Sequence, residues 1–396
     1  MSNRKIIIAC DTLFSGLGGM EKLAIELGDY LSKGDFVQFL FTHNMGKNFY
    51  SPSNNIESIF CKIDHMPEVE LDKDYDIYIY FCVNHYLIDH FRLAKKISKH
   101  IVVTESATPD RIVFNNWKRG SKIDATIDRY SILSKVDAIR VEIPESKSRF
   151  PSAMTKKVRV FPNSTKYIED ADRNYAIDNY NKQRIGIVLV GGRKPHKRLD
   201  ILVDAICEMD EKLVEKMDIF LPGTGNEGSD WVRRIKGKVE KCNMMEKFHF
   251  MGNVSDMTSV YKECAIHVTC SADESFGLST IESLAFGIPS IGCADAAGTR
   301  NIIKNNVNGL LYHGVENNKE LSELLEKLMC NYRLYNKLSK GAYRSRNKYS
   351  EELYYKNWDK LLDDVVNGKY KLNINKLNSI DSALIRSLQF HCDKII

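Results

Sequence analysis

The sequence predicts an α/β fold class with two parallel sheets in two domains. Short apolar runs alternate with helical segments, the alternation stops at a polar, Asn- and Asp-rich stretch (164–183), and then it starts again. Strands that alternate with helices indicate a parallel sheet. The chain has 396 residues, more than one ordinary core organises, and its 43% hydrophobic content supplies two cores.

The first series of apolar runs predicts strands at 5–10, 35–43, 77–82, 101–104 and 157–161. The first strand leads into a glycine-rich loop and an amphipathic helix from Met20 to about Ser32, which is how a nucleotide-binding fold begins. Gly16, Gly18 and Gly19 lack the dinucleotide spacing, but a glycine pair at a helix N-terminus lets backbone N–H groups close on a phosphate. We therefore expect a phosphate contact at Gly18 and Gly19.

The segment 86–100 predicts a helix with apolar residues on one face and basic residues mostly on the other. Such a helix can lie on an anionic bilayer surface. The alternative is a surface helix of the α/β domain with solvated lysines, which is the commoner case.

The second series predicts strands at 186–190, 218–221, 248–251, 266–270, 290–293 and 310–312. We assign 1–163 to an N-terminal domain, 164–183 to a linker, 184–345 to a C-terminal domain and 346–396 to C-terminal helices. Within this last part, 349–366 has helical apolar spacing, whereas 368–396 fits either a further helix or a partner-binding tail.

The stretch 271–289, SADESFGLSTIESLAFGIP, combines local structure with a specific chemistry. Ser279-x-x-Glu282 has the spacing of a capping box that opens a short apolar helix. Gly277 lets the backbone approach a ligand, and the first N–H groups of the helix face outward, which predicts an anion site. Glu274 lies before the turn at Gly277 and Glu282 lies one helical turn inside, so each carboxylate can reach a different hydroxylated group. A ligand with two sugars joined by a diphosphate suits the spacing of the two glutamates. Glu282 alternatively serves only its cap.

The string Glu-Ser-Phe-Gly-Leu-Ser-x-x-Glu-Ser-Leu-Ala-x-Gly-x-Pro, which starts at Glu274, resembles the donor-site signature of the family-4 retaining glycosyltransferases with the GT-B fold. The resemblance implies two Rossmann-like domains facing each other across a cleft, with a C-terminal helix crossing back to the N-domain. It implies that 184–345 hold a nucleotide sugar, that Glu274 positions sugar hydroxyls and that Glu282 accepts from the ribose. The other donor contacts that it implies are Gly18, Gly19, Gly223, Val254, Phe276, Gly277, Leu278 and Ser279.

Arg193 and Lys197 follow the strand at 186–190 and suit a departing diphosphate. Breaking a sugar–phosphate bond builds negative charge, which fixed cations stabilise in the transition state without a metal. The family usually has one more residue between its two cations. Assigning the family's lysine to Lys197 therefore assumes a one-residue deletion in this chain, and Arg198 is the alternative for the second cation. A retaining transfer then needs no enzyme nucleophile, because the donor phosphate accepts the acceptor's proton.

Glu105 follows the strand at 101–104, where the resembled family often carries a histidine beside the reacting sugar. Glu105 takes that polar role on the acceptor side, or the site is rebuilt around Arg111 or His85. A structural glutamate that caps 106–111 is an equal alternative.

Three rival functions have support in the sequence. Gly223-Thr-Gly-Asn-Glu-Gly228 matches the dinucleotide fingerprint, but the next strand ends in Gly252-Asn253 rather than in an acidic residue, which argues against a dehydrogenase. A nucleotide-sugar epimerase shares the architecture but needs acid and base residues that the N-domain does not identify. The third rival is a catalytically inactive binding partner with the GT-B fold. It is favoured by Glu105, which stands where the resembled family often has a histidine.

Composition limits the partners and the compartment. The net charge of +5 favours anionic partners without demanding nucleic acid. The ten cysteines form no Cys-x-x-Cys pair and are expected to be buried free thiols in a reducing compartment. With no signal sequence or membrane span expected, we predict a cytoplasmic protein, with peripheral contact at the inner membrane face as an option.

The predicted activity is transfer of a hexose-type sugar from a UDP- or GDP-linked donor to a glycan or lipid-linked acceptor. The resemblance places it in surface polysaccharide biosynthesis, with no cofactor and no metal.

Overall fold

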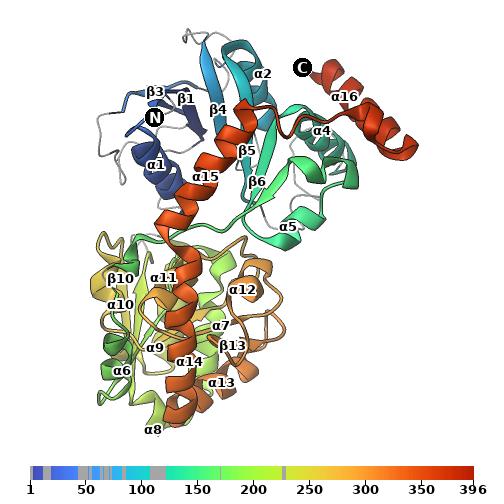
Figure 1. Ribbon diagram of the computed structural model, residues 1–396. Coiled ribbons are helices and arrows are strands. Elements are labelled where there is room, and N and C mark those ends of the chain that lie inside the picture. Colours follow the sequence, from blue (N-terminus) through green and yellow to red (C-terminus); the bar gives the residue numbers. More distant parts are fainter. Residues whose placement is uncertain are drawn as a thin grey trace. The chain divides into compact units, whose positions relative to one another are not determined.

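The computed structural model describes residues 3–11, 19–42, 52, 56–62, 66, 71, 74–82, 86–107, 122–169, 171–224 and 229–396 (Figure 1). The chain divides into two compact units: Met1–Asn163 with Tyr354–Ile396, and Ser164–Leu353. Each unit contains one parallel sheet with helices packed against it, which confirms the predicted α/β class with two Rossmann-like domains. Within the described residues, no helix has both the length and the apolar composition needed to cross a bilayer.

The first unit contains a seven-stranded parallel sheet in the order β3-β2-β1-β4-β5-β6-β7. Its strands are β1 (Lys5–Cys10), β2 (Phe36–Phe41), β3 (Ser58–Phe60), β4 (Tyr75–Cys82), β5 (Ser98–Glu105), β6 (Ala138–Val141) and β7 (Val158–Val160). Its helices are α1 (Gly19–Leu31), α2 (Leu87–Ile97), α4 (Lys122–Lys135), α5 (Pro144–Ser148), most of α15 (Glu351–Val366) and α16 (Ser379–Ile395), with 3₁₀ turns η2 (Ser152–Lys157) and η7 (Ile374–Lys376). The sequence pattern did not predict β3 and β6.

Helix α2 is part of the core of the first unit. Its apolar residues Leu87, Phe91 and Ala94 are buried against the sheet, whereas Lys95 and Lys96 are exposed. The apolar face is therefore not free to lie on a bilayer, and the surface-helix alternative is correct for this segment. The helix also ends at Ile97 and not at 100, because Ser98 already begins β5.

The segment from Tyr354 onward belongs to the first unit. Trp358 of α15 is fully buried, and the ring of Phe161 meets it edge-on at a centroid distance of 5.6 Å. The segment 368–396, for which the sequence allowed either a further helix or a partner-binding tail, contains a helix, α16, which packs beside α4 (Figure 1).

The second unit contains a six-stranded parallel sheet in the order β10-β9-β8-β11-β12-β13. Its strands are β8 (Ile185–Val188), β9 (Met217–Pro222), β10 (Phe248–Gly252), β11 (Ile266–Thr269), β12 (Ser290–Cys293) and β13 (Gly309–Tyr312). Its helices are α6 (Arg173–Tyr180), α7 (Leu199–Cys207), α8 (Glu211–Val214), α9 (Asp230–Lys241), α10 (Met257–Tyr261), α11 (Leu278–Ala285), α12 (Ala297–Ile302), α13 (Asn318–Cys330) and α14 (Tyr332–Ser345). Shorter 3₁₀ turns are η3 (Lys166–Ile168), η4 (Pro195–Lys197), η5 (Met245–Lys247) and η6 (Arg346–Tyr349).

The stretch predicted as a linker, 164–183, is instead part of the second unit. It forms α6, in which the ring of Tyr180 stacks on Tyr335 of α14 at a centroid distance of 3.9 Å. Asn179 of the same helix is buried and donates to the carbonyl of Lys262 at 2.6 Å. The polar composition of the stretch suggested exposure to solvent. The Asn179 side chain instead lies inside the unit and donates to backbone carbonyl groups.

One expectation about the cysteines is wrong. Cys207 at the end of α7 and Cys242 at the end of α9 form a disulfide. Cys330 is free and exposed rather than buried. The other free cysteines of the described residues are buried, as expected: Cys10, Cys61, Cys264, Cys270, Cys293 and Cys392.

Candidate active site

The sheet of the second unit has its topological switch point between β8 and β11. These two strands are neighbours, and the strand order runs outward from them in opposite directions, to β9 and β10 on one side and to β12 and β13 on the other. In open parallel sheets the loops at the carboxyl ends of such strands diverge and leave room for a ligand. The loop that carries Arg193 and Lys197 follows β8, and the stretch 271–289 follows β11.

The structure brings Lys197 and Glu274 together at this switch point. The Lys197 ammonium donates to Glu274 Oε2 at 2.5 Å, and the hydroxyl of Ser271 donates to the same oxygen at 3.2 Å. Both charged side chains keep contact with solvent, with exposed fractions of 22% and 14%. A cation and a carboxylate from different loops are therefore held where a ligand can reach both.

Two other cations of the loop after β8, Arg198 and Arg193, differ in the contacts of their side chains. Arg198 is paired with Asp200 of α7 and, through a bidentate contact at 2.7 and 2.6 Å, with Glu316. These carboxylates raise the pKa of Arg198 above its ordinary value. Arg193 is half-buried, and its backbone N–H donates to the carbonyl of Gly223 at 3.4 Å, but its guanidinium forms no hydrogen bond or ion pair with another described residue. This favours Lys197 over Arg198 as the second ligand-facing cation beside Arg193.

The turn that opens α11 differs from the prediction. The N-cap residue is Gly277, with φ +106°, and Ser279 lies inside the helix, so the predicted capping box does not form. Glycine is needed at this position because a positive φ strains other residues. The backbone N–H of Gly298 donates to the carbonyl of Glu274 at 2.8 Å, and Gly298 leaves no room for a Cβ beside Phe276. This close approach fixes the loop that carries Glu274.

Glu282 is buried with an exposed fraction of 8%, and it lies inside α11, whose N-cap residue is Gly277. It accepts a hydrogen bond from the Tyr261 hydroxyl at 2.9 Å. Burial raises the pKa of Tyr261 well above its ordinary value and the carboxylate raises it further, so the phenol stays protonated and remains a donor. Tyr261 thus helps to position Glu282.

The other residues of the second unit that were predicted to contact the donor lie in or near these loops. Gly223 follows β9 with φ +77°, and a Cβ there would come within 3.1 Å of the Gly191 backbone. Val254 packs on the cluster that includes Tyr261, and Phe276 is buried with its ring edge-on to Tyr349 at a centroid distance of 6.1 Å. Leu278 and Ser279 are half-buried in the first turn of α11. Residues 225–228, which complete the dinucleotide fingerprint, lie outside the described residues.

In the first unit, the predicted phosphate loop lies largely outside the described residues, together with Gly18, His85 and Arg111. Gly19 is the first residue of α1.

Glu105 is buried and forms an ion pair with Arg129 of α4, in which both side chains are fully inaccessible. It also accepts from the backbone N–H of Ala107 at 3.2 Å. These contacts favour the structural role of Glu105 over contact with an acceptor. A buried charge that loses its partner is costly, so this pair is needed by the fold.

Tyr261 and Ser271 are site residues that the sequence analysis missed. Ser271 stands three residues before Glu274, a spacing that allows a local hydrogen bond, and this signal was available in the sequence. Tyr261 is separated from Glu282 by 21 positions and belongs to no motif, so only the tertiary structure identifies it.

The chain thus has two Rossmann-like units, as in the GT-B fold, and the second unit brings a cation and a carboxylate, Lys197 and Glu274, together at its switch point. Residues 170–345, within the second unit, match the family described as glycosyl transferases group 1, and this match together with the relatives below shows that the chain is a glycosyltransferase.

Similar proteins agree with this assignment. The chain is 23% identical over 387 residues to the GalNAc-alpha-(1->4)-GalNAc-alpha-(1->3)-diNAcBac-PP-undecaprenol alpha-1,4-N-acetyl-D-galactosaminyltransferase of Campylobacter jejuni, covering 92% of this chain and 99% of the relative. Among solved structures, it is similar to sucrose-phosphate synthase from Thermosynechococcus elongatus, with a TM-score of 0.73, 17% identity and coverage of 92% and 100%. Anabaena HepE in complex with UDP and glucose matches with a TM-score of 0.70, 14% identity and coverage of 91% and 99%.

Proposed function

We propose that this glycosyltransferase moves a hexose-type sugar from a nucleotide diphosphate sugar to a hydroxyl of a glycan or lipid-linked acceptor, with retention of configuration and without a metal. The observation that carries the proposal is the meeting of Lys197 and Glu274 at the switch point between β8 and β11. Parallel sheets bind ligands at this place, and a diphosphate sugar needs both a cation and a hydroxyl acceptor there.

In this mechanism Arg193 and Lys197 bind the diphosphate. As the bond between the anomeric carbon and the phosphate oxygen breaks, its electron pair moves to that oxygen, and the two cations stabilise the growing negative charge. The first N–H groups of α11, beside Gly277, are directed at the same anion. The acceptor hydroxyl forms the new bond on the face that the phosphate leaves and gives its proton to the phosphate.

The two glutamates hold the rest of the donor. Glu274 accepts from hydroxyls of the sugar and offsets the positive charge that grows at the anomeric carbon. Glu282, oriented by Tyr261, accepts from the ribose hydroxyls of the nucleotide. Each oxygen of a carboxylate can accept more than one hydrogen bond, so the bond from Tyr261 does not prevent Glu282 from accepting one from a ligand hydroxyl.

The acceptor class is proposed from relatives. The Campylobacter jejuni relative has a polyprenyl diphosphate-linked glycan in its name, and it matches almost over the full length of both chains. We propose that the first unit binds an acceptor of this kind, in surface polysaccharide synthesis at the cytoplasmic face of the membrane.

Donor binding is tested by thermal shift with a panel of UDP-, GDP- and ADP-sugars. A ligand at a hundred times its dissociation constant stabilises the native state by about 2.7 kcal/mol. A response to NAD alone contradicts the donor assignment. Stabilisation by a nucleotide sugar without transfer or hydrolysis favours an inactive binding protein, and interconversion of the sugar without transfer favours an epimerase.

Catalysis is tested with Arg193→Ala and Lys197→Ala, which should each lower turnover roughly a hundredfold or more. Lys194→Ala is the matched control, because Lys194 is an exposed cation of the same loop, and it should keep normal turnover. Near-normal transfer by both active-site variants would show that the leaving-group role is wrong. Transfer that persists in EDTA supports the metal-independent mechanism, and product NMR with an inverted anomeric centre refutes retention.

A further inference from the structure

Helix α16 has apolar residues on two sides. One side is buried against the first unit, and the other is exposed. Ile385, Leu388 and Cys392 are buried against the core of the first unit. On the other side, Ile380 and Phe390 are exposed by 79% and 62%, and Leu384 by 37%. Ile380, Leu384 and Phe390 lie on one side of the helix together with Ala383 and the polar Ser387, and the three apolar residues are called the outward stripe.

The helix is firmly held, so this stripe is not a product of loose packing. The Asp381 carboxylate accepts from the Ser152 hydroxyl at 2.9 Å. At the other end, Asp393 pairs with Lys135 of α4, and His391 shares a hydrogen bond with Asp128 at 2.6 Å.

The unpaired charges of this segment are positive. Both aspartates of α16 have partners in the fold, Asp381 with Ser152 and Asp393 with Lys135. Arg386 and Lys376 are exposed and form no ion pair with any part of the chain that the structure describes. The Lys394 ammonium lies 4.4 Å from the centre of the Phe390 ring, at the end of the stripe. An apolar stripe with unpaired cations beside it is complementary to an apolar surface that carries negative charge.

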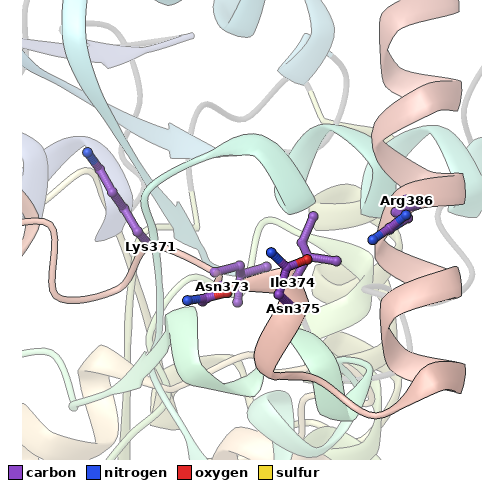
Figure 2. Close-up of a pocket in the computed structure, with 6 residues that line it drawn as sticks. Lys371, Asn373, Ile374, Asn375 and Arg386 are labelled. Atoms are coloured by element: carbon purple, nitrogen blue, oxygen red, sulfur yellow. The ribbon is translucent and has the colours of Figure 1, made fainter.

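A pocket beside the helix adds hydrogen-bond donors to these cations. It has a volume of about 530 Å³ and is lined by residues 371–375 and by Arg386 (Figure 2). Figure 2 shows Arg386 on α16 facing the segment that carries Asn373 and Asn375. The side-chain amides of these asparagines have no hydrogen-bond partner among the described residues. A guanidinium with amide donors is the usual chemistry for holding a phosphate.

We propose that the outward face of α16 and this pocket form a docking surface for a bilayer of anionic phospholipid. Ile380, Leu384 and Phe390 would lie in the headgroup and acyl boundary, while Arg386 and Lys394 remain at the level of the lipid phosphates. The surface extends the proposed use of a lipid-linked acceptor, but it does not rest on the transfer reaction, because vesicle binding is measured without a donor.

The test is co-sedimentation of the full chain with vesicles of phosphatidylcholine, with and without phosphatidylglycerol. The wild type should bind the anionic vesicles, more weakly at high salt. The double variant I380S/F390S should lower the partition coefficient about tenfold or more, and R386E/K394E should do the same. The control is V307S, because Val307 is a comparably exposed apolar residue, at 55%, in the second unit. It should bind like the wild type.

Three outcomes overturn the proposal. The first is equal vesicle binding by the wild type and both double variants, provided that their melting temperatures show them to be folded. The second is equal binding to vesicles with and without the anionic lipid. The third is a dimer in gel filtration that I380S/F390S abolishes, since a second copy of the chain would then cover this face.

Discussion

His267 in β11 predicts a specific weakening of the second unit in mild acid. Its side chain is fully buried, and its Nδ1 shares a hydrogen bond with the Ser290 hydroxyl at 3.1 Å. Nε2 has no partner among the described residues. Burial, together with the nearby charge of Lys197, lowers the pKa of His267 from 6.5 to about 3. The native state therefore holds this imidazole neutral.

The size of the effect follows from proton linkage. Below pH 6.5 the unfolded chain binds a proton at this histidine and the native state does not, so stability falls as the pH falls. Each pH unit in that window costs about 1.4 kcal/mol, which gives a loss of about 2 kcal/mol between pH 7 and pH 5 from His267 alone. The loss ends near pH 3, where the native state is also protonated.

The assay is urea unfolding at pH 7 and pH 5, compared between the wild type, His267→Gln and His313→Gln. Glutamine is neutral at both pH values, so the His267 variant should lose about 2 kcal/mol less than the wild type on acidification. His313 has an exposed fraction of 71%, and its variant should keep the wild-type pH response. Equal losses in the wild type and in His267→Gln would refute the reasoning.

Two further predictions concern Tyr261 and the disulfide. Tyr261→Phe should lower the free energy of unfolding by about 1–3 kcal/mol and raise the KM for the donor, because the buried Glu282 carboxylate loses a hydrogen-bond donor. Unchanged urea unfolding and an unchanged donor KM would argue against the positioning role of Tyr261. Reduction of the Cys207–Cys242 disulfide, which closes a separation of 35 residues, should destabilise the chain by about 3–4 kcal/mol. A reductant should then lower the melting temperature of the wild type but not of C207S/C242S, and an unshifted wild type would contradict this.

The sequence by itself determined the class of fold and the location of the site. Parallel strands are buried on both faces, so most of them appear as short apolar runs that local pattern can detect. Gly277 was also recognisable locally, since a turn that needs a positive φ selects glycine. β6 was not predicted because Arg140 interrupts its apolar run. This arginine is buried where the carbonyl of Phe161 and the side chain of Asn163 accept from it and Glu142 forms an ion pair with it.

The tertiary structure decided which side chains meet. Lys197 faces Glu274 and Arg198 does not, because two carboxylates, one of them on the distant Glu316, hold Arg198 elsewhere. The pairing of Glu282 with Tyr261 and the burial of Glu105 against Arg129 likewise join residues from separate elements. Hydrophobic periodicity records only which face of a strand or helix is buried, and polar partners that are distant in the chain become neighbours only when the sheet and its helices have assembled.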